Sequence, residues 1–258
     1  MKTFFISLMT VMILFSGSQL AGQDAAAISK KSMDVVDMGS IQMDLTIHIL
    51  DNKGNDRIRK IRIITGTFDD VNKTLIRFIA PPEVKGTSLL IYDYEDKDDD
   101  MWIYMPALRK VRRIVSSEKG KSFMGSEFTN ADMSRPNQSD FNYEILGTEL
   151  YEGKMCWKIE SAGISSDVRK ASGYSKTISF IDQENYLCHK VEYYDLSGSL
   201  HRIQYISDFR KQKGSNYIAC RMTMENIQNK RTSQMTVDHF ETGMQFSENA
   251  FSPSILQQ

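Results

Sequence analysis

The sequence predicts a mainly β protein whose large antiparallel sheet curls around a few short helices. Segments with strand character recur along most of the chain, and turn sequences separate them at the spacing typical of antiparallel barrels and sandwiches. Only three short regions look helical: residues 25–37, the neighbourhood of Asp132, and residues 246–256. A large antiparallel sheet must bury one face, and with so few helices available it has to curl on itself to do so.

The first strands show the pattern most clearly. Residues 42–49 alternate polar and apolar side chains in a strict period of two, and the turn sequence Asp-Asn-Lys-Gly follows at 51–54. A partner strand is expected at 58–65. A third strand, at 75–79, should end before the two prolines at 81–82, because proline is excluded from central strands.

Ten further segments have strand character and complete the expected sheet. Turn sequences separate many of them, including the acidic run at 95–100 and the turn sequences at 182–185 and 213–214. The ten segments are 88–94, 101–105, 109–115, 142–146, 154–160, 175–181, 186–194, 200–209, 217–224 and 233–240.

The segment between the expected strands at 101–105 and 142–146 is the most informative part of the chain. It contains a strand with four cations and then a Gly- and Ser-rich loop that carries Phe123, Met124 and Phe128. The loop is too long and too apolar for a simple connection, and long loops in compact domains are usually lids or binding loops. We therefore interpret this segment as the rim of a binding site.

Several motifs in this segment and on either side of it match one known family. They are Trp-Ile-Tyr-Met-Pro-Ala-Leu-Arg-Lys-Val-Arg-Arg-Ile at 102–114, Ser-Phe-Met-Gly-Ser-Glu-Phe-Thr at 122–129, Asp132, Arg77-Phe78, Pro81-Pro82, Gly-Thr-Ser-Leu-Leu at 86–90, Trp-Lys-Ile at 157–159, and Lys-Val-Glu-Tyr-Tyr-Asp at 190–195 with Gly198. Together they resemble the outer-membrane lipoprotein-sorting proteins, which are LolA-like relatives of the periplasmic lipoprotein carrier. The resemblance implies an incomplete (half) barrel of about eleven strands around helices, with an apolar hollow.

Such a hollow suits an acyl chain, because burial of each CH₂ group is worth ~0.8 kcal/mol. Twelve of the fifteen methionines lie beyond residue 22, and flexible thioethers suit varied acyl chains, although they are also common core filler. Trp102 and Tyr104 alternate with Met101 and Met105 along one strand, so only one of these pairs can face the hollow. The candidate ligand-binding residues of the hollow and its lid are Met101, Trp102, Tyr104, Met105, Phe123, Met124 and Phe128.

The cationic strand permits two interpretations. Arg109, Lys110, Arg112 and Arg113 place charge on both faces of the strand. In the functional interpretation, Arg109, Arg112 and Arg113 contact an anionic headgroup or an acidic membrane partner. In the structural interpretation, this is an edge strand that charge protects against aggregation.

The N-terminus predicts export. Residues 1–22 contain one cation, a short apolar run and then small residues, which is typical of a secretory signal peptide and too short to span a bilayer comfortably. No cysteine lies near the cleavage region, so we expect no lipid anchor and a periplasmic protein. Without Lys2, the remaining 31 Lys and Arg face 33 Asp and Glu, a net charge of −2 that argues against nucleic-acid binding. Residues 23–258 suffice for one half-barrel domain.

Three cysteines, Cys156, Cys188 and Cys220, lie in the expected strands. In a meander they fall on every second strand, roughly 9–10 Å apart, which exceeds the ~7 Å Cα limit for a disulfide. We therefore expect no disulfide. Cys220 shares a face with Ile218 and Met222 and should pack as a small apolar residue.

Nothing in the sequence indicates catalysis, a cofactor or a metal. The four histidines are scattered, and no Gly-x-Ser-x-Gly elbow or Cys-x-x-Cys pair is present. The acidic run at 95–100 lacks the central Gly and the terminal Glu of a helix–loop–helix calcium loop, which favours a solvated turn. We do not expect an enzyme.

These observations favour a monomeric periplasmic carrier that binds lipoprotein or lipid acyl chains and transfers them between the inner and outer membranes. The resemblance implies an inner-membrane transporter of the ABC or RND type as the donor. The alternative is a periplasmic sensor or adaptor that uses the same fold to bind a membrane transporter or regulator.

Overall fold

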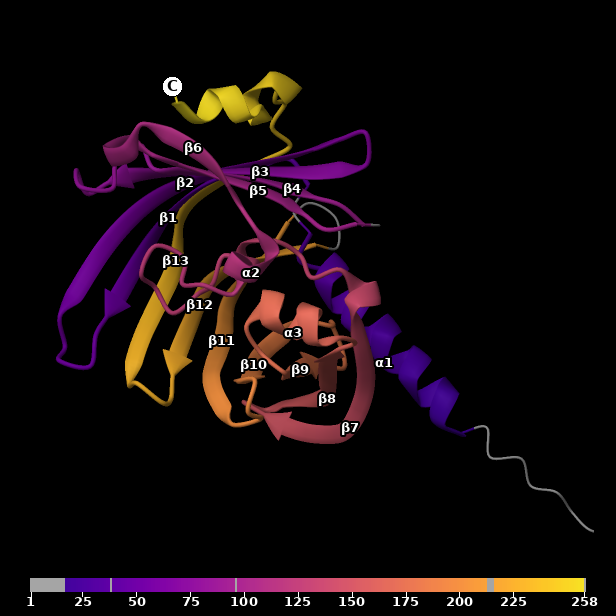
Figure 1. Ribbon diagram of the computed structural model, residues 1–258. Helices are drawn as coiled ribbons and strands as arrows, with labels where there is room; N and C mark the ends of the chain where they lie inside the picture. Colours follow the sequence, from indigo (N-terminus) through magenta and orange to yellow (C-terminus); the bar gives the residue numbers. More distant parts are fainter. Residues whose placement is uncertain (1–16, 38, 96, 213–215, 258) are drawn as a thin grey trace, which may run out of the picture.

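The computed structural model describes residues 17–37, 39–95, 97–212 and 216–257. Within them, thirteen strands form a single antiparallel sheet that curls strongly (Figure 1). The strands are β1 (Ile41–Leu50), β2 (Asp56–Phe68), β3 (Val71–Ala80), β4 (Ser88–Asp93), β5 (Asp100–Met105), β6 (Lys110–Ile114), β7 (Phe141–Tyr151), β8 (Lys154–Gly163), β9 (Lys176–Asp182), β10 (Cys188–Tyr194), β11 (Leu200–Lys211), β12 (Tyr217–Asn226) and β13 (Arg231–Thr242).

The mainly β fold is confirmed, since each of the thirteen expected segments is a strand. The resemblance implied about eleven strands, so that count was two too low. The three regions expected to be helical contain helices: α1 (Gly17–Asp34), the 3₁₀ turn η2 (Ala131–Met133), and the 3₁₀ turns η4 (Glu248–Phe251) and η5 (Pro253–Gln257). The predicted signal peptide, residues 1–22, lies for the most part outside the described residues.

Helix α3 (Ser166–Ser172) lies outside the regions expected to be helical. Ser165 caps its start, because its hydroxyl accepts a hydrogen bond from the Val168 N–H (3.2 Å). Gly173 ends it in the left-handed conformation that favours glycine. A serine and a glycine eight residues apart were therefore the local signal for this helix.

The order of the strands divides the sheet into two meanders. Strands β1 to β6 follow one another along the sheet, strands β7 to β13 do the same, and the pairing of β1 with β13 joins them. In the described chain, β6 and β7 are therefore the two edge strands. The connection from Ile114 to Phe141 starts at one edge and ends at the other, and it crosses the concave side, where its Phe123 and Phe128 join the apolar cluster.

The concave face carries the largest apolar cluster. On β1, every second side chain from Ile41 to Ile49 points to this face and is at most 6% exposed. The register continues the layer across neighbouring strands, with Ile61 beside Leu45 and Met235 beside Ile47. This layer is what the crossing connection covers.

The convex face of β3 to β6 is covered by the C-terminal segment, residues 246–257 (Figure 1). Phe251 and Leu256 are fully buried there, together with the outward-facing Leu90 of β4. The Tyr92 hydroxyl also donates a hydrogen bond to the Phe251 carbonyl (2.7 Å). This half of the sheet therefore buries apolar side chains on both faces.

Helix α1 lies across the other end of the sheet, beside β7 (Figure 1). Ala25 is buried against Ile159 of β8 and Ile181 of β9. The Lys31 ammonium lies 3.9 Å from the centre of the Tyr186 ring. None of the described helices has the length and apolar content needed to cross a membrane.

The cysteines occupy alternate strands, as the sequence predicts. Cys156 lies on β8, Cys188 on β10 and Cys220 on β12, and β9 and β11 separate them. All three are free thiols. Cys220 is buried in the concave cluster beside Ile218, which confirms its predicted role as a small apolar residue.

Candidate functional site

The connection between the edge strands forms a small hairpin inside the curl. After α2 (Ser116–Lys119), residues 121–130 fold back on themselves. The Phe123 N–H donates to the Phe128 carbonyl (2.8 Å), and the Ser126 hydroxyl donates to the Phe123 carbonyl (2.7 Å). We call residues 121–130 the plug hairpin, because they fill part of the concave side.

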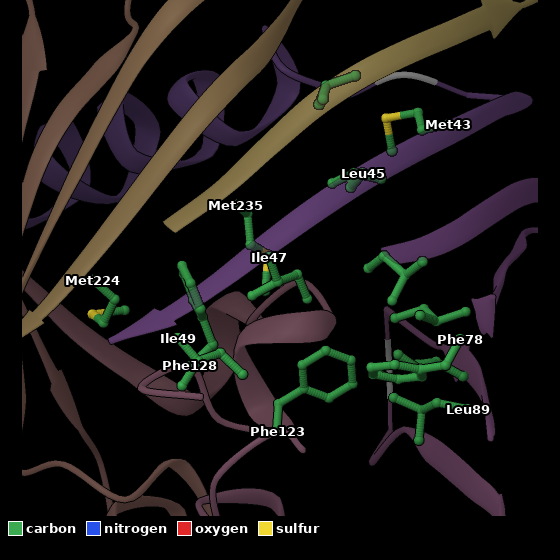
Figure 2. Close-up of a cluster of buried hydrophobic side chains, with 14 of the residues drawn as sticks. Met43, Leu45, Ile47, Ile49, Phe78, Leu89, Phe123, Phe128, Met224 and Met235 are labelled. Atoms are coloured by element: carbon green, nitrogen blue, oxygen red, sulfur yellow. The ribbon is translucent and has the colours of Figure 1, made fainter. Parts of the chain in front are cut away.

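Two aromatic rings anchor the plug hairpin in the apolar layer. Phe123 and Phe128 are 2% and 1% exposed. Figure 2 shows Phe123 directed from the hairpin towards Phe78 and Leu89, and the Phe123 and Phe78 ring centroids are 5.6 Å apart. Burial of each ring is worth about 2–3 kcal/mol. The two rings of the hairpin therefore complete the apolar cluster of the concave side.

Polar contacts hold the tip of the hairpin to β11, β12 and β13. The buried Glu127 carboxylate lies 2.8 Å from Arg231 Nε and accepts a hydrogen bond from the Asn226 amide (2.7 Å). The Glu127 N–H donates to the Ser233 hydroxyl (2.9 Å), and its carbonyl accepts from Arg202 (2.7 Å). A buried carboxylate is tolerated when it is paired and hydrogen-bonded, and Glu127 meets both conditions.

Among the described residues, two cavities on the concave side share a wall, and residues 134–136 line both of them. The larger, about 480 Å³, lies between α2, α3 and the start of β7. Its lining is rich in charged groups: Lys97, Asp98, Asp99, Lys119, Arg135, Asp140, Asp167 and Lys170. The smaller, about 290 Å³, lies between the end of α1 and the inner face of β2 to β4. Its apolar lining includes Met33, Val36, Ile91 and Met133.

Arg135 ties the segment between the cavities to α1 and to β4. Its guanidinium donates to the Asp34 carboxylate (2.9 Å) and to the Asp37 carboxylate (2.8 Å). Its main-chain N–H donates to Asp93 (3.2 Å). One residue, Arg135, therefore holds the wall between the two cavities, with its side chain bound to two carboxylates and its main-chain N–H bound to a third.

Asp93, at the smaller cavity, has a strongly perturbed carboxyl group. Burial raises its pKa to about 6, and the nearby Asp99 carboxylate adds to the increase, while the Arg135 N–H and guanidinium act in the opposite direction. Ionisation of Asp93 is therefore less favourable in the folded protein than in the unfolded chain.

Replacing Asp93 with asparagine should stabilise the protein at neutral pH. Because the folded pKa is above the ordinary value of 3.8, the contribution of Asp93 to stability is full below pH 4 and is lost as the pH rises through about 6. At pH 8 the variant should gain about 1–2 kcal/mol, a value reduced for partial solvent screening. Urea unfolding of both proteins at pH 4 and pH 8 measures this. An equal difference at the two pH values would contradict the assignment.

The register shows which pair of β5 side chains faces the concave side. Met101 is fully buried in the concave cluster, and Met105 follows the same alternation. Trp102 and Tyr104 point to the convex face and pack with the C-terminal segment. The structure therefore separates Trp102 and Tyr104 from the other predicted ligand-binding residues, and ligand contact by the rest stays a prediction. The predicted residues that share the concave cluster are Met101, Phe123, Met124 and Phe128.

The cationic strand β6 is an edge strand of the sheet. Arg112 is paired with Glu118 (2.6 Å), and Arg113 is paired with Asp100. Arg109 follows the 3₁₀ turn η1 (Pro106–Leu108) in the left-handed conformation, with φ of 48°. The edge position agrees with the structural interpretation of this strand. Headgroup or partner contact by Arg109, Arg112 and Arg113 stays a prediction.

The arginines around the plug hairpin were not among the predicted site residues. Arg57, Arg202 and Arg231 come from β2, β11 and β13, so only the order of the strands brings them together. One local signal was present, since Glu127 is the only charged residue between Lys121 and Asp132.

The described part of the chain contains no group of three His, Cys, Asp or Glu side chains that could hold a metal ion. The charged groups of the larger cavity are mixed in sign, and Lys119 lies 3.7 Å from Asp99. What the concave side offers chemically is an apolar surface with charged groups at its rim.

Comparisons with known proteins agree with this geometry. A family model described as "Uncharacterized protein" matches residues 70–258. A solved domain named for outer membrane lipoprotein sorting, from Vibrio parahaemolyticus, is 25% identical, with a TM-score of 0.85 over 92% of this chain and 100% of that one. No curated protein matches the chain.

Two further solved structures share the fold. A DUF1329 family protein from Desulfovibrio piger is 23% identical, with a TM-score of 0.84 over 92% of this chain and 99% of that one. A LolA superfamily protein from Nitrosomonas europaea is 19% identical, with a TM-score of 0.71 over 88% of this chain and 97% of that one.

Proposed function

The chain belongs to the LolA-like family of outer-membrane lipoprotein-sorting proteins, and on this basis we propose that it is a periplasmic carrier of acyl chains. The cargo is a lipoprotein or lipid whose acyl chains enter the concave side of the sheet. An inner-membrane transporter of the ABC or RND type is the proposed donor. Transfer needs no covalent chemistry, because differences in affinity between donor, carrier and acceptor suffice.

The observation that carries this proposal is that the plug hairpin covers the apolar concave face of the sheet. The apolar layer on β1 and its neighbours lies beneath the plug hairpin, a segment that belongs to no strand of the sheet. The hairpin crosses that face because the chain must pass from edge to edge, and the sheet hydrogen bonds do not depend on it. The plug hairpin can therefore move away from the apolar face without disrupting the sheet.

The two cavities give the site room beside the plug hairpin. The smaller cavity has apolar walls from α1 and β4, and the larger, more polar cavity adjoins it at residues 134–136. An acyl chain placed along the apolar walls leaves the polar end of its cargo near the charged rim. Each buried CH₂ group contributes ~0.8 kcal/mol to binding.

Dye binding tests the proposal. The mature protein should strongly enhance the fluorescence of an apolar dye, and a long-chain fatty acid or a lipopeptide should compete the dye away. An unrelated compact protein of similar size is the control, since it shows how much dye binds to any exposed protein surface. Dye binding no stronger than that of this control would contradict the carrier function and favour the adaptor alternative.

A further inference from the structure

Three arginines of the concave side, Arg57, Arg202 and Arg231, contact the tip of the plug hairpin, and Arg59 lies two residues from Arg57 on the same face of β2. We infer that they form a binding site for the anionic head group of an acyl-bearing ligand, and that the plug hairpin occupies this site in the present structure. The inference rests on the proposed function and adds to it the chemistry of the cargo's head group: a phosphate or a carboxylate.

The sheet register brings the four residues onto one surface. Arg57 and Arg59 are alternate residues of β2, opposite Ile49 and Ile47 of β1, whose side chains point to the concave side. Arg202 and Arg231 flank a single residue of β12, Asn226, in one row across β11, β12 and β13. Positive charge from three strands is thus concentrated at one end of the apolar layer.

The plug hairpin supplies this surface with oxygen acceptors. The Glu127 carboxylate contacts Arg231 and Asn226, and the Glu127 carbonyl accepts from Arg202. The Gly125 carbonyl accepts a further hydrogen bond from Arg231 (2.9 Å) and a longer one from Arg57 (3.4 Å). Guanidinium groups are suited to binding the oxygens of carboxylates and phosphates. The hairpin tip therefore takes the place that an anionic head group would take.

The site holds donors that the hairpin leaves unused. Arg202 is 4% exposed, and its Nε has no hydrogen-bond partner among the described residues. Arg59 Nε also has no hydrogen-bond partner among the described residues. The Arg59 side chain is 11% exposed, and its Nη1 lies 3.7 Å from the Glu83 carboxylate. Buried donors without a partner are costly, so an oxygen-rich ligand would satisfy the site better than the hairpin does.

Charge balance makes the site selective for anions. With the hairpin in place, the Glu127 carboxylate compensates Arg231, and Asp132 lies 3.7 Å from Arg202. When the hairpin leaves, the Glu127 charge leaves with it, and the guanidinium groups remain partly buried. A neutral ligand would leave this positive charge uncompensated, which is unfavourable. The neighbouring apolar layer, vacated by the Phe128 ring, would receive the acyl chain.

The test compares two probes with the same chain, dodecyl phosphate and dodecyl maltoside, as competitors of a bound apolar dye. Wild-type protein should bind the phosphate about tenfold more tightly, as expected for one or two charge-assisted hydrogen bonds. The ratio of the two competition constants is the readout, because any change in the stability of the plug hairpin affects both probes equally. Inorganic phosphate alone should not displace the dye.

Two variants locate the effect. The first variant is Arg57→Gln, at an exposed position where the change should not affect folding. The second combines Arg57→Gln with Arg231→Gln. Both should reduce the ratio of the two competition constants, and the double variant should bring it close to one. Arg62→Gln is the matched control, since Arg62 lies on the same strand and is paired with Asp44 on the opposite face. The control should keep the wild-type ratio.

The outcomes separate this inference from the proposed function. Equal affinity of the wild type for both probes, or a ratio unchanged in the double variant, overturns the head-group site and leaves the acyl carrier intact. Failure of both probes to displace the dye overturns the carrier function as well. Displacement of the dye by inorganic phosphate alone also overturns the inference, since the anion site would then not require an acyl chain.

Discussion

Replacing Phe123 with alanine should lower the free energy of unfolding by about 3 kcal/mol and, at the same time, tighten the binding of an apolar dye. The stability falls because Phe123 is almost fully buried against Phe78. The affinity rises because a ligand must displace the plug hairpin, and a weaker hairpin is displaced at lower cost. If the substitution weakens the docking of the plug hairpin on the sheet by about 1.4 kcal/mol, the affinity for the dye increases about tenfold.

The matched control for this prediction is Phe180→Ala. Phe180 is 1% exposed but packs in a separate cluster with Cys156 and Ile178, beneath the Lys190 ammonium. It should lose similar stability without any gain in dye affinity. Urea unfolding and dye titration of both variants measure the two quantities. Equal changes in dye affinity for Phe123→Ala and Phe180→Ala would mean that the hairpin does not compete with the ligand.

Replacing Leu256 with alanine should detach the C-terminal segment from the convex face. Leu256 is 1% exposed, and a buried Leu→Ala change typically costs about 2–5 kcal/mol. Detachment would uncover Trp102 and Tyr104, which the segment now covers. The uncovered apolar patch should also promote self-association.

Acrylamide quenching of tryptophan fluorescence and size-exclusion chromatography measure these effects. Only two tryptophans are present, and Trp157 packs against Tyr186 in a different part of the sheet. Quenching should therefore increase through Trp102 alone. Leu150→Ala is the control, because Leu150 is 65% exposed and should change neither stability nor quenching. Unchanged quenching in Leu256→Ala would show that the segment does not depend on this anchor.

The strands could be predicted from the sequence because their signal is local. In the segment that became β1, alternation alone indicates both the strand and the face that is buried, as with Leu45 and Ile47. The motifs at 102–114 and 122–129 additionally predicted the family to which the fold belongs. The partners of each strand within a meander also follow, since consecutive strands joined by short turns pair with one another.

The faces of β5 could not be predicted, because both are apolar and both are covered. Met101 is buried beneath the connection, whereas Trp102 is partly buried beneath residues 246–257, and the alternation is the same in either arrangement. The arginine site was missed for a related reason. Arg57 and Arg231 are far apart in the sequence, and they approach only because β1 and β13, at opposite ends of the described chain, pair in the middle of the sheet.

That pairing has a consequence for how the protein acquires its structure. Within each meander, contacts join residues close in sequence, and such contacts form quickly. The β1–β13 ladder is different: the Thr46 hydroxyl donates to the Asp238 carboxylate (2.7 Å) across 192 positions of the chain. Closing so large a loop is entropically expensive and slow. We expect each meander to form early and the β1–β13 pairing to form last, because that pairing requires both β1 and β13 to be present.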